Sequence, residues 1–225
     1  MNNLLNKYLN KEEQNEFSSI VEPIYKSYEF QRRLTSEFPH HGKVTLGEHI
    51  IEVAILTYKK CKKKKDVDLK TSVYIAMMHD LYTIPWQNNE DGNVKKFINK
   101  HGFRHPIEAV INSINWFPLI YKENNSEVII DGILHHMYPL PVRRYKLNTS
   151  LLELKNNNDI DDEYKNIILK STRRGKILGT SFSRSKYKEG RIVSHCDKKV
   201  SFSQIKNINN LTSLVTGHNK NLLKK

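Results

Sequence analysis

Apolar residues recur along much of the chain at the three- and four-residue spacing of amphipathic helices. The clearest helix begins after Thr45, because Thr45 and Glu48 form an S/T-x-x-E capping box and an apolar run through Tyr58 follows. The lysine-rich segment 59–65 marks the end of this helix, where cations interact favourably with the helix dipole. A second helix is predicted over 69–81, with its apolar residues on one side.

Further helices are predicted on both sides of this pair. One begins near Pro106, a residue suited to the first helical position, and ends before Pro118. Another covers 126–137, and the last carries the apolar residues of 192–200. The scattered apolar positions of the first 33 residues fit one or two more helices. Strand-type alternation with hairpin turns is absent, so the predicted fold class is all-α, a helical bundle in one domain.

Composition narrows the class of protein. The chain has 225 residues, and its 37 Lys and Arg against 24 Asp and Glu give a formal charge of +13. No stretch approaches the about 18 consecutive apolar residues of a membrane span, and the first residues lack the apolar core of a signal peptide. Cys61 and Cys196 are too few for a disulfide framework, and we expect reduced thiols. These features predict a soluble cytoplasmic protein without a membrane partner.

The positive charge is concentrated in two segments, 59–65 and 165–199. The second contains eleven Lys and Arg against two acids, together with glycines and serines. Such a segment is typical of a phosphate-contacting loop, and an equally plausible interpretation is a mobile surface loop without function. Charge alone predicts an anionic partner without distinguishing nucleic acid from a small molecule.

Histidines and carboxylates at the core-facing ends of separate predicted helices carry the candidate chemistry. Helical bundles build metal sites in this way, and a buried imidazole or carboxylate needs a partner. Nitrogen and oxygen donors suit Mn, Fe, Co, Ni or Zn, and because the candidate set contains no cysteine, a structural zinc finger is excluded. The set comprises His49, His79, Asp80, His105, His135, His136 and Asp197.

The order of these residues resembles a known signature. His49, the His79-Asp80 pair and Asp197 resemble the H…HD…D motif of the HD-domain metal-dependent phosphohydrolase superfamily. The sequence around these residues is also similar to small, stand-alone bacterial HD-domain proteins, over roughly 35–145 and the helix around Asp197. The local blocks are His41-Gly42, Glu48-His49, Met78-His79-Asp80-Leu81-Tyr82, His101-Gly102-Phe103-Arg104-His105-Pro106, His136-Met137-Tyr138-Pro139-Leu140 and Val193-Ser194-His195-Cys196-Asp197-Lys198. The chain departs from this group in a longer interval between His136 and Asp197.

The resemblance implies an HD-domain bundle with a metal site in its core. We expect an N-terminal helical extension over 1–34 that packs on this core. The HD domain itself would cover 35–205, with a basic insertion at about 145–190. A basic Asn/Lys-rich tail would follow over 206–225.

The resemblance also implies one or two divalent transition-metal ions. His49, His79, Asp80 and Asp197 would hold the first ion. Asp80 and Asp197 would be the catalytic carboxylates, with Asp197 orienting the attacking water or accepting its proton.

A second ion would be held by His105 and His136, with Asp80 bridging the two ions. His135 is an additional candidate ligand, ranked below His136 because the similar proteins often have another residue there. The candidate substrate-binding residues are Arg104, Arg143, Arg144, Lys198, His41 and His101.

The function implied is hydrolysis of a phosphoester in a nucleotide or another small phosphorylated substrate by metal-activated water. Three alternatives stay open: a nuclease that binds single-stranded nucleic acid through 165–199, a di-iron oxygenase, and a non-catalytic regulatory module. The sequence also leaves open whether the protein is a homodimer.

Overall fold

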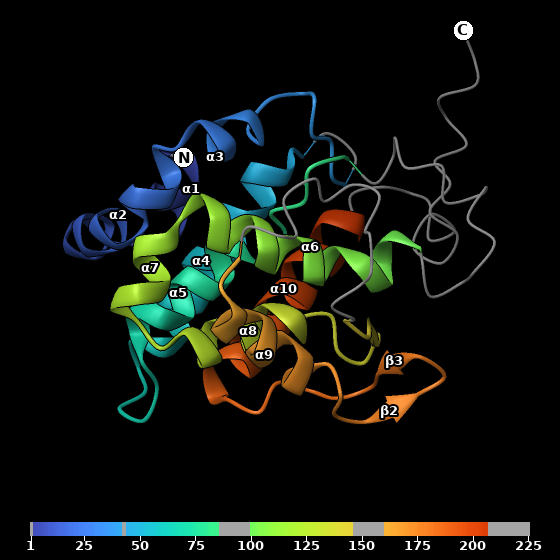
Figure 1. Ribbon diagram of the computed structural model, residues 1–225. Helices are drawn as coiled ribbons and strands as arrows, with labels where there is room; N and C mark the ends of the chain where they lie inside the picture. The colour runs from blue at the N-terminus through green and yellow to red at the C-terminus, as the bar shows by residue number, and fades with distance from the viewer. Residues whose placement is uncertain (1, 42–43, 86–99, 146–159, 207–225) are drawn as a thin grey trace, which may run out of the picture.

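The computed structural model describes residues 2–41, 44–85, 100–145 and 160–206. Within these ranges the chain is mainly helical, which confirms the all-α prediction (Figure 1). A single hydrophobic core contains residues from the N-terminal helices through to the last helix. In the described ranges, no helix combines the length and apolar character needed to cross a membrane.

Helix α4 (Leu46–Cys61) begins and ends as its sequence predicts. Thr45 accepts a hydrogen bond from the backbone of Glu48, and the Glu48 side chain accepts one from the backbone of Thr45. This capping box satisfies two backbone donors that the first turn leaves without partners. Lysines occupy the last turn, and Lys62 is the C-cap, so the first part of the lysine run is a helix end.

Helix α5 (Leu69–Met78) lies at the centre of the molecule. Every residue from Thr71 to Met78 is buried, because α2, α4, α8 and α10 all pack around it. The helix ends at Met78, three residues before the predicted end, and His79 is its C-cap. The chain therefore leaves the helix in the middle of the core, which places His79 and Asp80 there.

The N-terminal region forms three helices rather than one or two: α1 (Asn2–Tyr8), α2 (Lys11–Tyr25) and α3 (Tyr28–Arg32). New N-caps at Asn10 and Ser27 divide the region, because each side chain accepts a backbone hydrogen bond and starts another helix. Helix α1 packs on α4 and α2 packs on α5. The predicted boundary near residue 34 stays a prediction.

Helix α6 (His101–Trp116) begins five residues before the predicted start at Pro106. The proline lies in the second turn, where it removes only one backbone hydrogen bond and the rest of the helix is retained. Its end before Pro118 is confirmed. The proline then opens a short helix that was not predicted, α7 (Pro118–Glu123).

Three helices complete the bundle: α8 (Ser126–Leu134), α9 (Asp162–Ser171) and α10 (Lys188–Lys206). Helix α8 ends three residues before the predicted end, because His135 adopts a non-helical backbone conformation with φ −110°. His136 therefore lies in a turn, and this turn is buried against the core.

A small antiparallel sheet, in the order β1-β3-β2, overturns the prediction that hairpins are absent. Its strands are β1 (Val142–Arg143), β2 (Lys176–Ile177) and β3 (Thr180–Ser181). Strands of two residues are too short to show alternation in a sequence. The β2–β3 turn places Leu178 and Gly179 at φ 45° and 84°, the left-handed region that two-residue hairpin turns use, and the hairpin extends away from the helices (Figure 1).

Asp131 of α8 fixes the basic segment to the bundle. Its buried carboxylate accepts hydrogen bonds from the Ser171 hydroxyl at 2.8 Å, the Ser185 hydroxyl at 2.7 Å and the Lys186 amide at 2.8 Å. Arg174 adds an ion pair. The basic segment is therefore not a mobile loop in its described residues, since it forms α9, the hairpin and the start of α10.

Helices α8 and α10 approach each other at two glycines. A Cβ atom on Gly190 would lie 2.6 Å from the Cα of Gly132, and a Cβ on Gly132 would lie 2.7 Å from Cδ1 of Ile75. A larger side chain at Gly190 would separate α8 from α10, and one at Gly132 would displace Ile75 of α5. Gly190 therefore permits a close backbone approach between α10 and α8, the helices that carry Asp197 and precede His136.

Candidate metal centre

Six of the predicted ligands lie together in the core, all of them buried. Each of five helices delivers one or two of them. They are His49 from α4, His79 and Asp80 directly after α5, His105 from α6, His136 after α8 and Asp197 from α10.

One carboxylate oxygen of Asp80 lies against a pair of histidines. Asp80 Oδ1 is 3.3 Å from Nε2 of His105 and 3.4 Å from Nε2 of His136, and the two Nε2 atoms are 3.2 Å apart. Donors bound about 2.1 Å from one metal ion lie about 3.0–3.4 Å from each other in octahedral or tetrahedral geometry. This triangle of donors therefore has the dimensions of one ion site.

The other oxygen of Asp80 lies against a second pair of histidines. Asp80 Oδ2 is 3.5 Å from Nε2 of His79 and 3.9 Å from Nε2 of His49. Asp197 Oδ1 completes this group at 3.2 Å from Nε2 of His49 and 3.9 Å from Nε2 of His79. Asp80 consequently stands between two groups of donors and presents one oxygen to each.

Hydrogen bonds at Nδ1 orient three of these imidazoles. Each Nδ1 of His79, His105 and His136 lies 2.7–3.1 Å from a backbone carbonyl oxygen three or four residues earlier. A carbonyl oxygen only accepts, so Nδ1 of each neutral ring carries the proton and Nε2 presents its lone pair to the centre. The acceptors are the carbonyl oxygens of Ala76, His101 and Ile133.

A chain of side chains orients the fourth imidazole, His49. Its Nδ1 lies 3.0 Å from Oε1 of Gln204, and Nε2 of Gln204 donates to Glu52 at 3.0 Å. The Glu52 carboxylate can only accept, so the Gln204 amide must turn its oxygen toward His49. Glu52 also accepts a 2.7 Å hydrogen bond from Tyr8 in α1, which connects the centre to the N-terminal helices. Sequence reasoning missed Gln204, because its contact joins residues far apart in the chain.

The centre contains buried polar atoms whose arrangement requires a cation. Among the described residues, Nε2 of His49, Nε2 of His79 and Oδ1 of Asp80 have no hydrogen-bond partner. With Nδ1 protonated, these imidazoles turn lone pairs toward each other and toward carboxylates, which is unfavourable in a buried site. A proton or a metal ion between them removes the repulsion. The nitrogen and oxygen donors suit Mn, Fe, Co, Ni or Zn, so the residues fit a divalent transition metal.

Burial and charge set the protonation of the donors. Burial lowers the pKa of His79 to about 4, so its ring is neutral at physiological pH. For Asp80, burial favours the protonated form, but His79, His105 and His136 outweigh it and hold the pKa well below its usual range. For His49 and His136, burial favours the neutral ring, but Asp197 and Asp80 outweigh it and raise the pKa. These two rings therefore favour a bound proton beside the ionised carboxylates, and a metal ion would replace that proton when it binds.

His135 lies outside this centre. Its Nε2 is 3.0 Å from Oγ of Ser171 and its Nδ1 is 3.4 Å from Oγ of Ser183, so both nitrogens contact serines of the basic segment. Ser171 donates its proton to Asp131, which leaves Nε2 of His135 as the donor to Ser171. The structure thus places this candidate ligand in the Asp131 network, away from Asp80.

The predicted substrate-binding histidines have different environments. His101 is buried, stacks on His105 with ring centroids 4.9 Å apart, and packs against the Tyr82 ring. His101 therefore supports His105, a candidate metal ligand, and its own ring is too buried to contact a substrate. His41 is half-buried with its ring centroid 6.4 Å from that of His49, and burial lowers its pKa to about 4.

The predicted substrate-binding cations divide into two groups. Arg104 of α6 and Arg143 of β1 are half-buried, and burial and then the charge of Arg104 lower the pKa of Arg143. Arg144 follows directly and its amide donates to Gly179. Lys198 forms the second group on its own. It lies on α10, with its Nζ 3.0 Å from Oγ of Ser194.

One histidine at the centre was not predicted. The His40 ring centroid lies 4.1 Å from that of His49, and donors of His40, His49 and Asp80 come within 4.8 Å of one another. A bridge between Pro39 and Thr45 folds the segment back onto the start of α4. The sequence feature that could have indicated His40 is its position next to His41, just before the helix capped by Thr45.

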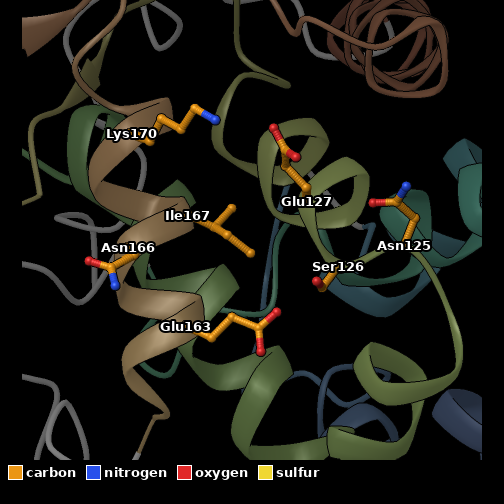
Figure 2. Close-up of a pocket in the computed structure, with 7 residues that line it drawn as sticks. All are labelled: Asn125, Ser126, Glu127, Glu163, Asn166, Ile167 and Lys170. Atoms are coloured by element: carbon orange, nitrogen blue, oxygen red, sulfur yellow. The ribbon is translucent and has the colours of Figure 1, made fainter.

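The hollow in Figure 2 is separate from the metal centre. It has a volume of about 490 Å³ and lies between the start of α8 and α9, where Glu163, Ile167 and Lys170 project toward Glu127. No histidine lines it, and its charges are mixed. This hollow therefore offers no second group of histidine ligands for a metal ion.

Comparison of the chain with protein-family models, with curated proteins and with solved structures finds no match in any of the three. The interpretation of the centre rests on its own geometry.

Proposed function

We propose that this protein is a metal-dependent phosphohydrolase of the HD-domain type, acting on a nucleotide or another small phosphorylated substrate. The observation that carries the proposal is the position of Asp80. Its two oxygens contact separate pairs of histidines, as expected for a carboxylate that bridges two ions.

In this proposal, two groups of residues hold the metal ions. His49, His79 and Asp197 would bind one ion, His105 and His136 the other, and Asp80 both. Two divalent ions held close together supply Lewis acidity and a water of lowered pKa, and they stabilise the attacking and leaving oxygens of a phosphoester displacement.

The residues of the chain would perform three tasks. The Nδ1 hydrogen bonds fix the rings, so that little reorganisation is needed when a ligand binds. Asp197, which accepts a 3.2 Å hydrogen bond from Ser201, would orient the water or accept its proton. Arg104 and Arg143 are half-buried cations that would contact the substrate phosphate.

Metal analysis and a phosphatase screen test the proposal together. We expect about two Mn, Fe, Co, Ni or Zn ions per purified chain and metal-dependent phosphate release from nucleotides or sugar phosphates. His79→Ala should abolish both, whereas His195→Ala, a substitution of an exposed histidine outside the centre, should change neither. A wild-type protein that binds no transition metal under these conditions contradicts the proposal.

The same preparation separates the other candidate functions. Cleavage of single-stranded oligonucleotides without release of phosphate from small substrates would indicate a nuclease. Consumption of oxygen by the iron-loaded protein would indicate an oxygenase. Bound metal with no turnover in either assay would indicate a regulatory module.

A further inference from the structure

A second polar cavity, of about 240 Å³, lies beside the start of α10. The turn after α8 supplies one wall with Tyr138, and the segment before α10 supplies Arg184. Helix α10 supplies Arg191, Ser194, His195 and Lys198, and His135 and Ser185 complete the lining. None of the six candidate metal ligands lines this cavity.

The cavity is positively charged without a counter-ion from the protein. No carboxylate lines it, and among the described residues Arg184, Arg191 and Lys198 form no ion pair. Asp131 accepts from the cavity-lining Ser185 but is already occupied by Arg174 and two other donors, and Asp197, the residue before Lys198, is one of the candidate metal ligands. An anion inside the cavity would therefore meet three cations that form no ion pair with a carboxylate of the cavity wall.

The hydrogen bonds identify which groups are available to a ligand. Ser194 is buried and accepts from Lys198 Nζ at 3.0 Å, which leaves its own proton for a further acceptor. Arg191 uses Nη1 for backbone oxygens of Ser185 and Lys186, which fixes the guanidinium at the cavity wall. These donors match the several acceptor oxygens of a phosphate group.

Aromatic rings adjoin the same cations. The Tyr138 ring lies 6.0 Å from Lys198 Nζ and 5.5 Å from the ring of Phe182. Phe182 is 42% exposed, so one of its surfaces is open to a flat ligand. Aromatic side chains beside cations are the combination that binds the bases and phosphates of nucleotides.

We propose that this cavity is a nucleotide-binding site separate from the metal centre, with the phosphate held by Arg184, Arg191, Ser194 and Lys198 and the base stacked on Phe182 and Tyr138. The proposal concerns binding alone. It holds whether or not the metal centre hydrolyses a phosphoester.

Calorimetric titration of the metal-free protein tests the site, with AMP, inorganic phosphate and adenosine as probes. We expect one AMP per chain, weaker binding of phosphate, and no detectable binding of adenosine. Arg184→Ala and Lys198→Ala should each weaken AMP binding about tenfold. Lys122→Ala, which removes a cation of α7 outside the cavity, should leave it unchanged.

A second variant separates the two parts of the site. Phe182→Ala should lower the affinity for AMP toward that for phosphate and leave phosphate binding unchanged, because Phe182 contacts only the base and Tyr138 remains in place. Circular dichroism checks that each variant is folded, which we expect because Arg184 and Phe182 are exposed.

Two results would overturn the proposal. One is the absence of AMP binding by the metal-free wild type at concentrations up to about 1 mM. The other is equal affinity in the wild type and in a folded double variant of Arg184 and Lys198. AMP that binds only after metal is restored would belong to the metal centre, so failure here is distinguishable from failure of the proposed hydrolase.

Discussion

Oε1 of Gln204 lies 3.0 Å from Nδ1 of His49, although 155 positions of the sequence separate the two residues. Gln204 contacts no other candidate ligand in the described hydrogen bonds, and its amide is oriented by Glu52. It therefore acts on the centre through the orientation of one imidazole.

We predict that Gln204→Ala weakens metal binding about 10- to 100-fold, because His49 loses the partner that fixes its ring and tautomer. Competition with a chelator of known affinity measures the effect. Ser203→Ala is the matched control, since this neighbour is exposed. Equal affinities of wild type and Gln204→Ala would mean that the contact does not position His49.

His136→Ala should reduce the number of bound ions from about two to about one. The variant removes one donor of the triangle around Asp80 Oδ1 and leaves the donors around Asp80 Oδ2 in place. Elemental analysis of the folded variant gives the number directly. His135→Ala should retain both ions, because its nitrogens contact Ser171 and Ser183.

Asp131→Ala should lower the free energy of unfolding by about 3 kcal/mol, because it leaves Arg174 and several buried donors without their acceptor. Urea denaturation followed by circular dichroism measures the change. Asp162→Ala removes an exposed carboxylate paired with Lys165 and should have little effect. Similar losses in the two variants would contradict the anchoring role of Asp131.

Both thiols should react slowly with Ellman's reagent at pH 8 and rapidly in denaturant. Cys61 and Cys196 are free and buried, and burial raises the pKa of Cys61 to about 11. The reactive thiolate is therefore scarce and inaccessible in the folded protein. Absorbance of the released chromophore gives the rate, and a fast native reaction of either thiol would contradict this packing.

The sequence predicts the features that depend on neighbouring residues. The capping box of Thr45 and Glu48 is local, so the start of α4 could be predicted to the residue. Helical spacing likewise placed His79 at the end of an apolar helix. Pro106 was misleading, because a proline is tolerated in a second turn as well as in a first.

Features that depend on long-range packing could not be predicted. The acceptor for His49 and the serine partners of His135 are set by side chains that meet only after folding. Two-residue strands carry no periodic signal, which is why the hairpin at Gly179 was missed.

The glycine contact between α8 and α10 has a consequence for the number of metal ions that the centre can hold. His136 follows α8 and Asp197 lies on α10, so the Gly132–Gly190 approach limits how far apart the two groups of donors stand. Gly190→Ala would push the helices apart and increase the separation between the two groups of donors. We expect Asp80 then to reach only one of the two groups, so that the protein binds fewer ions even though neither glycine is a candidate ligand.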